Sequence, residues 1–275
     1  MGKQKLIFLD IDGTLVTAGS NVPPDSALAA IRSARAKGHK VFLCSGRNYA
    51  MLSPLLKYPF DGVVAGAGSY IVCGEEVIYD HPMTDEQRDL MLTTLHKHGV
   101  FCTVEAKDAT YGDENLGDFL ADAGPGNSEI ERWRRALAED LDIRPMSEYD
   151  GRPVYKVVFM CTQESQLTEA KELLEKDFNF CTQVAAAHGC LNGELIGRDF
   201  DKGRGVLRVC EHLGIPVEDT YGFGDSMNDL EMIETVGTSV CMDNGAQALK
   251  DRSDLVCPSV EEDGLAKAFE QLGLS

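Results

Sequence analysis

The sequence has few basic residues for its size. Its 26 lysines and arginines are outnumbered by 45 aspartates and glutamates, so the formal net charge of the 275-residue chain is −19 at pH 7. Proteins that bind nucleic acid non-specifically, or that adhere to anionic membranes, need a basic surface. The charge balance therefore argues against nucleic-acid and membrane partners. It does not exclude a small anionic substrate, because a few local cations can reverse the potential inside a cleft.

Long apolar runs are absent as well. No segment approaches the roughly 20 apolar residues of a membrane-spanning helix. The apolar run near the start of the chain is broken at Asp10 and Asp12. A secretory signal peptide needs a longer apolar segment and a small-residue cleavage site. We therefore expect neither a membrane anchor nor secretion.

The cysteines lack the spacing of a disulfide framework or a zinc site. There are nine of them, an odd number, and no two form a CxxC pair. Several lie inside apolar runs, among them Cys44, Cys161 and Cys210. We interpret them as reduced, buried thiols of a cytoplasmic protein.

The rest of the composition is that of an ordinary globular protein, with 43% hydrophobic and 26% charged residues. Continuous apolar runs at 6–9, at 41–44 and from residue 63 are typical of strands buried on both faces of a parallel sheet. A helical pattern from Pro24 to Gly38 lies between the first two, and a second helix is expected over 48–57. The alternation predicts an α/β fold with a doubly wound, mostly parallel sheet.

The middle of the chain follows a different pattern. Thr84 to Gln87 has the capping-box sequence that begins a helix, and Ser128 to Glu131 has it again. Strands are expected at 100–104 and 154–160. This segment predicts an α+β domain whose sheet is covered on one face.

After residue 197 the first pattern resumes. Val206, Val209, Cys210 and Leu213 have the spacing of an amphipathic helix. Further strands are expected at 219–223, 240–242 and 255–257. We therefore expect a core domain in two parts, residues 1–82 and 198–275, interrupted by the α+β domain at 83–197.

Two carboxylates follow the first strand, in the sequence Asp10-Ile11-Asp12-Gly13. Ligands of open α/β sheets bind beyond the carboxyl ends of the strands. Two carboxylates this close are costly unless a cation balances them, and Mg²⁺ suits oxygen ligands. An isolated sequence of this kind would more simply be a turn that caps the next segment.

Polar residues at three further places favour a binding site over a simple turn. Ser45-Gly46-Arg47 ends the second strand, and Asp225 to Asp229 follows the strand at 219–223. Lys202 lies near a helix N-terminus, where anions are favoured. Each has a simpler explanation when taken alone: a helix cap, a first-turn acid or a solvated charge. Their occurrence together favours one phosphate- and metal-binding site.

These motifs resemble those of the haloacid dehalogenase-like phosphohydrolases. Within that family they are most similar to the Cof-type branch, in which a large cap domain is inserted between the second and third motifs. The four motifs match Asp10 to Leu15, Ser45 to Arg47, Lys202-Gly203 and Gly224 to Asp229. The resemblance extends over nearly the whole chain and implies a Rossmann-like core with an inserted cap.

The resemblance also implies a chemistry. The chain would be a Mg²⁺-dependent phosphatase for a small phosphorylated metabolite, either a sugar phosphate or a phosphorylated cofactor. Asp10 would be the nucleophile that forms an aspartyl-phosphate, and Asp12 the general acid and base. The Asp10 side chain, the Asp12 main-chain carbonyl and Asp225 would hold Mg²⁺, with Asp229 supporting them from behind. The phosphoryl oxygens would be held by Ser45, Gly46, Lys202 and Asn228, and the charge of Lys202 would offset repulsion between the two anions.

Two positions depart from the pattern of the branch. Ala67-Gly68-Ser69 occupies the place of the usual Asn-Gly-Ala, so a polar contact near the phosphate or the cap hinge is expected to be missing or supplied by Ser69. Asp243 stands where a glycine is usual, which predicts a reshaped loop without loss of the chemistry.

Two other functions are compatible with the same residues. A phosphomutase or phosphotransferase would pass the phosphoryl group from the same intermediate to an alcohol. A non-catalytic protein that binds a phosphorylated ligand would keep the pocket for sensing. The full set of motif acids together with Lys202 favours catalysis. The sequence specifies neither the substrate nor the oligomeric state.

Overall fold

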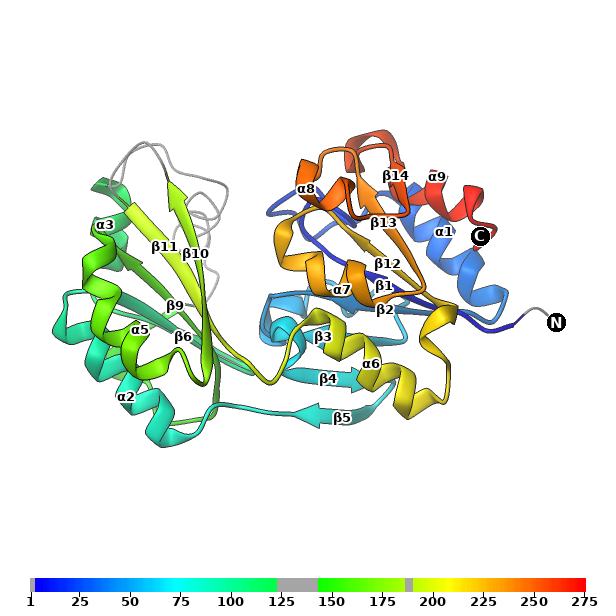
Figure 1. Cartoon of the computed structure of the whole chain (residues 1–275). Coiled ribbons are helices and arrows are strands. Elements are labelled where there is room, and N and C mark those ends of the chain that lie inside the picture. The colour runs from blue at the N-terminus through cyan, green and yellow to red at the C-terminus, as the bar shows by residue number, and fades with distance from the viewer. Residues whose placement is uncertain (1–2, 123–142, 186–189) are drawn as a thin grey trace. The chain divides into compact units, whose positions relative to one another are not determined.

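The chain folds into two compact units in the computed structural model (Figure 1). The structure describes residues 3–122, 143–185 and 190–275. The first unit combines Met1–Asp80 with Phe200–Ser275, and the second is His81–Asp199. The boundaries expected from the sequence are 82/83 and 197/198. The helix start expected at 128–131 lies outside the described residues.

The first unit is built on an eight-stranded sheet. In spatial order its strands are β14 (Leu255–Cys257), β13 (Thr238–Met242), β12 (Thr220–Gly224), β1 (Leu6–Leu9), β2 (Lys40–Cys44), β3 (Gly62–Ala65), β4 (Tyr70–Cys73) and β5 (Glu76–Asp80). The strands from β14 to β3 run parallel, and β4 and β5 extend the sheet in antiparallel pairing. The predicted α/β fold with a mostly parallel sheet is confirmed.

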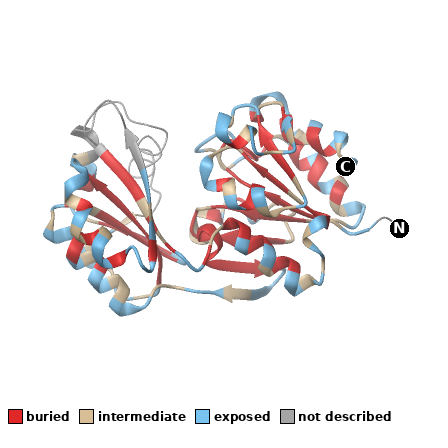
Figure 2. Cartoon of the chain, in the orientation of Figure 1, coloured by how far each residue is buried: buried red, intermediate tan, exposed pale blue. Residues whose placement is uncertain are grey.

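Helices cover both faces of this sheet (Figure 1). On one face α6 (Lys202–Leu213) and α7 (Leu230–Thr235) share a core cluster with β1, in which Phe8 packs with Val206 and Met232. On the other face lie α1 (Asp25–Ala36) and α9 (Gly264–Gln271), which pack against each other. The ring of Phe269 in α9 lies 5.3 Å from that of Phe223 in β12. Burial on both faces explains why these strands are apolar runs and not alternating ones (Figure 2).

The second unit contains a six-stranded sheet. In spatial order its strands are β10 (Phe178–Ala185), β11 (Cys190–Gly197), β9 (Val154–Cys161), β6 (Phe101–Ala106), β7 (Thr110–Gly112) and β8 (Ile143–Pro145). All neighbouring strands are antiparallel except β7 and β8. Helices α2 (Asp85–Lys97) and α5 (Thr168–Leu174) cover one face of the sheet.

Two local predictions about this part of the chain have opposite outcomes. The capping box is confirmed, since the Thr84 hydroxyl accepts the Gln87 N–H and the Gln87 side chain accepts the Thr84 N–H. The expectation that the sheet is covered on one face is wrong. Helix α3 (Leu116–Asp122) packs Leu116 against Val158 and Met160 on the opposite face.

The helix predicted over 48–57 does not form. The segment contains a single 3₁₀ turn, η1 (Ala50–Leu52), followed by turns. Proline lacks the N–H that a helix interior needs, so Pro54 interrupts the helical pattern. Among the described helices, none is long and apolar enough to cross a membrane.

Truncation of Phe8 tests the importance of the core beneath α6. Its side chain is fully buried and stacks on Phe42 with ring centroids 5.3 Å apart. We expect Phe8→Ala to lower the free energy of unfolding by about 3–5 kcal/mol, measured by urea denaturation. Leu207→Ala on the outer side of α6, where the leucine is 46% exposed, should cost far less. Equal losses in the two variants would contradict this account of the core.

Candidate active site

The carboxyl ends of three strands meet at one edge of the first sheet. Strand β1 lies between β12 and β2, with Leu9 level with Phe223 on one side and Leu43 on the other. The residues that follow these strands therefore lie side by side. Asp10 follows β1, Ser45 follows β2 and Asp225 follows β12. The Asp10 N–H donates to the carbonyl of Phe223 at 2.9 Å, which fixes its place next to β12.

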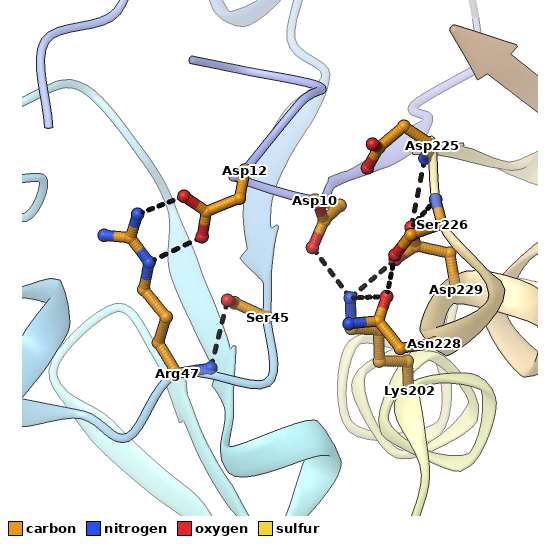
Figure 3. A network of polar contacts seen from close by, with 9 residues as sticks. All are labelled: Asp10, Asp12, Ser45, Arg47, Lys202, Asp225, Ser226, Asn228 and Asp229. Carbon is orange, nitrogen blue, oxygen red and sulfur yellow. Dashed lines mark hydrogen bonds and ion pairs between the residues drawn. The ribbon is translucent and has the colours of Figure 1, made fainter. Parts of the chain in front are cut away.

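Lys202 reaches this edge from the first residue of α6. Asp201 caps the helix by accepting the Arg204 N–H at 2.7 Å. The Lys202 side chain is 1% exposed, and its Nζ donates to Asp10 Oδ1 at 2.7 Å and to Asp229 Oδ1 at 2.5 Å. A third contact joins Nζ to Asn228 Oδ1 at 3.3 Å (Figure 3). One buried ammonium group therefore connects the first, third and fourth motifs.

The carboxylates around Lys202 are electrostatically strained. Burial, followed by the negative charge of Asp229, raises the pKa of Asp10 well above its usual value, and Lys202 opposes that shift. The same two causes, in the same order, raise the pKa of Asp225 to about 7. Burial alone would lower the pKa of Lys202, but Asp10 and Asp229 raise it, so the ammonium stays charged. One lysine leaves the cluster with excess negative charge.

Asp229 organises the loop after β12. Its side chain is fully buried, and its Oδ2 accepts the N–H groups of Asp225 and Ser226 at 3.0 and 3.1 Å. Its other oxygen binds Lys202. The Asp225 carboxylate therefore stands on a loop that its neighbour Asp229 holds in place.

The residues present fit a divalent cation. One carboxylate oxygen each from Asp10, Asp225 and Asp229 lie within 4.8 Å of one another. Asp225 Oδ1 is buried and has no hydrogen-bond partner within the described part of the chain. A hard cation such as Mg²⁺ prefers oxygen ligands and would offset the charge that Lys202 leaves unbalanced.

Gly13 and Asn244 shape the floor of this cluster. Gly13 has a φ of +85°, and a Cβ there would lie 2.3 Å from Asp225 Oδ2, so no larger residue fits. Asn244 donates to the Gly13 carbonyl at 2.8 Å and accepts the Val260 N–H at 3.0 Å. Asn244 was not among the residues expected in the site, although it directly follows Asp243, one of the two positions that depart from the branch pattern.

Asp12 lies in a separate group of contacts. Its carboxylate turns away from Asp10 and forms a bidentate ion pair with Arg47, with Nε–Oδ2 at 2.8 Å and Nη2–Oδ1 at 2.6 Å (Figure 3). Nη1 of Arg47 donates to Asn21 Oδ1 at 2.6 Å. Arg47 and Asn21 were not among the predicted site residues. The sequence did contain a signal for the ion pair with Asp12. The second motif includes Arg47, and a guanidinium that becomes buried on folding needs an acidic partner.

Ser45 and Gly46 lie between the two groups. The Ser45 hydroxyl accepts the Arg47 N–H at 3.1 Å, and the residue is 3% exposed. A Cβ added at Gly46 would meet no atom within 4 Å, so the backbone there borders open space. Asn228 is exposed and also accepts a hydrogen bond from the Ser226 hydroxyl at 2.7 Å.

The residues at the two departures from the family pattern lie outside the hydrogen bonds that join Lys202 to the carboxylates. Ala67 adopts a left-handed conformation with φ of 54°, which asparagine tolerates better, and its N–H donates to the Ser45 carbonyl at 2.9 Å. Ser69 is fully buried and its hydroxyl donates to Gly66 in its own turn. Asp243 forms an exposed ion pair with Lys250 at 2.9 Å.

A cavity of about 470 Å³ in the first unit lies elsewhere. It is at the amino ends of β1 and β2, where His39, Lys40 and Asp61 are among its lining residues. The bidentate pairing of Arg35 with Asp61 there is a structural ion pair. The clustered carboxylates and Lys202 lie at the opposite end of these strands.

Comparison with known proteins places the chain among hydrolases of one family. The family model of haloacid dehalogenase-like hydrolases matches residues 7–269. YkrA of Bacillus subtilis is 30% identical over 279 residues, and the match covers 98% of both chains. The 5-amino-6-(5-phospho-D-ribitylamino)uracil phosphatase YwtE of Bacillus subtilis is 27% identical over 283 residues, again covering 98% of both.

Solved structures agree with the sequence relatives. The subclass IIB sugar phosphatase BT4131 superposes with a TM-score of 0.78 at 27% identity, and the match covers 99% of this chain and 100% of that one. The resemblance seen in the motifs is thereby confirmed. The chain belongs to the haloacid dehalogenase-like hydrolase family and is a phosphoric monoester hydrolase.

Proposed function

We propose that the chain is a Mg²⁺-dependent phosphatase that acts through an aspartyl-phosphate on Asp10. The observation that carries the proposal is the hydrogen bond from Lys202 to the Asp10 carboxylate within a cluster of three acids. The single ammonium group does not balance the negative charge of these acids. Asp10, the Asp12 main-chain carbonyl and Asp225 would hold Mg²⁺, which supplies positive charge against the phosphate when it is bound. Asp229 would support the metal ligands through the loop that it orders.

The residues divide the reaction into two displacements. An Asp10 oxygen attacks phosphorus, forming an O–P bond while the ester P–O bond breaks, and Asp12 protonates the departing oxygen. Asp12 then takes a proton from water, whose oxygen attacks phosphorus and releases phosphate from Asp10.

Charge and hydrogen bonding hold the phosphoryl group during both steps. Lys202 provides a fixed ammonium beside Asp10, so the approach of two anions is less costly there. The Ser45 hydroxyl, the backbone at Gly46 and the Asn228 side chain are proposed to bind the phosphoryl oxygens. Their hydrogen-bonding groups are placed by the end of β2 and by the loop after β12.

The substrate we propose is a small phosphorylated metabolite, either a sugar phosphate or a phosphorylated cofactor. BT4131 is named a sugar phosphatase and YwtE is named for a phosphorylated ribitylaminouracil, so both names support a small phosphorylated metabolite. We propose that the second unit is the cap that sets the selectivity for the substrate.

We also propose that neither nucleic acid nor a membrane is a partner, and that the protein works in the cytoplasm. Six cysteines in the described segments are buried, which fits reduced thiols in a reducing compartment.

Replacement of Asp10 tests the nucleophile. With p-nitrophenyl phosphate as substrate, we expect Mg²⁺-dependent turnover by the wild type and a fall in kcat of at least about a thousandfold in Asp10→Asn, equivalent to about 4 kcal/mol in the barrier. Asp243→Asn makes the same chemical change at an exposed acid and should leave kcat unaltered. Substantial turnover by a folded Asp10→Asn variant would refute the proposed nucleophile.

Replacement of Asp12 should separate the two displacements. p-Nitrophenolate leaves without a proton, so Asp12→Asn should still phosphorylate Asp10, whereas the second step loses its base. We expect a burst of p-nitrophenolate equal to the amount of enzyme, and an intact mass increased by one phosphoryl group. The absence of any burst would count against the covalent intermediate.

The products of the wild type distinguish a phosphatase from a phosphotransferase. Phosphate and p-nitrophenol should form in equal amounts. A deficit of phosphate relative to p-nitrophenol in the presence of added sugars would identify a phosphotransferase instead.

A further inference from the structure

A second group of metal-ligating side chains lies within the second unit, remote in sequence from the motif residues. His96, Cys102 and Asp113 each offer one ligand atom, and the three atoms lie within 4.8 Å of one another. His96 is in the last turn of α2, Cys102 is in β6 and Asp113 follows β7. The sequence shows no metal-binding spacing here because the three residues come from different elements.

Asp113 is held rigidly beside Cys102. Its N–H donates to the Cys102 carbonyl at 3.0 Å, and its Oδ2 accepts the Cys102 N–H at 2.7 Å. The side chain thus takes the place of a main-chain carbonyl in the pairing of β6 with the residue after β7. A carboxylate fixed by its own strand pairing has little conformational freedom to lose when it binds a ligand.

His96 is oriented by the same carboxylate. Its Nε2 lies 2.9 Å from Asp113 Oδ2, and this hydrogen bond raises the pKa of the imidazole. A tight turn at Gly99, with φ of +68°, leads from α2 into β6 and brings His96 back over the start of the strand. The His96 side chain is 40% exposed and that of Asp113 is 15% exposed, so solvent reaches the group from one side.

The Cys102 thiol forms the buried side of the group. It is fully buried on the face of the sheet that α2 covers, and its only described contact to a hydrogen-bond acceptor is to the Val100 carbonyl at 3.8 Å. Burial, with a smaller effect of the Asp113 charge, raises the pKa of the thiol well above its usual value. A buried, protonated thiol beside a carboxylate is unreactive by itself, and it becomes a strong ligand once a metal replaces its proton.

We propose that His96, Cys102 and Asp113 form a binding site for a divalent transition metal, with Zn²⁺ as the preferred ion. Tetrahedral zinc with bonds of about 2.0–2.3 Å separates its ligand atoms by roughly 3.3–3.8 Å, so the group closes on the ion with shifts of roughly 1 Å. One nitrogen, one sulfur and one oxygen ligand suit zinc better than Mg²⁺, which takes oxygen ligands. Water occupies the fourth position on the exposed side.

Binding exchanges protons for the metal. The ion forms bonds to Cys102 Sγ, a ring nitrogen of His96 and a carboxylate oxygen of Asp113, and the thiol proton leaves to the buffer together with any proton on the ring nitrogen that binds. No electron is transferred. The bound ion joins the end of α2 to β6 and to the residue after β7, and so stabilises the second unit whether or not the first unit is catalytically active.

The test uses Co²⁺ on the full-length, reduced protein at mildly alkaline pH with excess Mg²⁺. Thiolate-to-cobalt charge transfer absorbs in the near ultraviolet, and an active site of carboxylate oxygens does not produce it. We expect one equivalent of Co²⁺ to give this band and tetrahedral visible bands. Zn²⁺ should displace the cobalt, because it generally binds more tightly to such ligands. Zn²⁺ should also raise the melting temperature.

Variants assign the site to its ligands. Cys102→Ser should abolish the charge-transfer band, and Asp113→Asn, which keeps an acceptor for the Cys102 N–H, should weaken Co²⁺ binding at least about tenfold. Cys161→Ser, at a buried thiol on the neighbouring strand β9, is the matched control and should keep the band. No charge-transfer band in the wild type, or an equal band in a folded Cys102→Ser variant, would overturn the proposal. Both outcomes are independent of phosphatase activity.

Discussion

Burying a carboxylate is costly unless a positive charge lies beside it, and in this protein the ammonium group of Lys202 supplies that charge to Asp10 and Asp229. The three groups are almost completely enclosed, so salt and water do little to screen the repulsion between the two carboxylates. Lys202 comes from the first turn of α6, Asp10 from the end of β1 and Asp229 from the turn before α7. The interaction therefore joins three elements of the first unit at the edge where the chemistry is proposed to occur.

The order of the strands makes this meeting possible. Asp10 and Lys202 are separated by 192 positions along the chain, with the whole second unit between them. They become neighbours because β12, which follows α6, pairs with β1 in parallel and in register. A parallel sheet places the carboxyl ends of its strands at one edge, so residues from distant motifs share that edge. Helices on both faces bury the strands and keep this edge rigid.

Much of the first unit could be predicted from the sequence, because its signals are local. Apolar runs identified strands buried on both faces, and in the second unit the capping sequence at Thr84 identified the start of α2. The helix expected over 48–57 does not form, because Pro54 lacks the N–H that a helix interior needs. The sheet of the second unit was expected to be covered on one face, but Leu116 and α3 pack on the other, and that packing depends on contacts between distant segments.

Among the site residues, the sequence by itself determined which chemical groups are available. The sequence identified Asp10, Asp12, Ser45, Asp225 and Asp229 because they follow apolar strands, and Lys202 because it lies near the start of a helix. Both signals are local properties of the chain. Only the tertiary structure decided which of these groups touch. It placed Lys202 between Asp10 and Asp229, turned Asp12 toward Arg47 and Asn21, and brought Asn244 beneath Gly13. It also gathered His96, Cys102 and Asp113 from three elements. The physical reason is that a hydrogen bond or a metal site depends on distances of about 2–3 Å between atoms, and sequence separation alone does not set such distances.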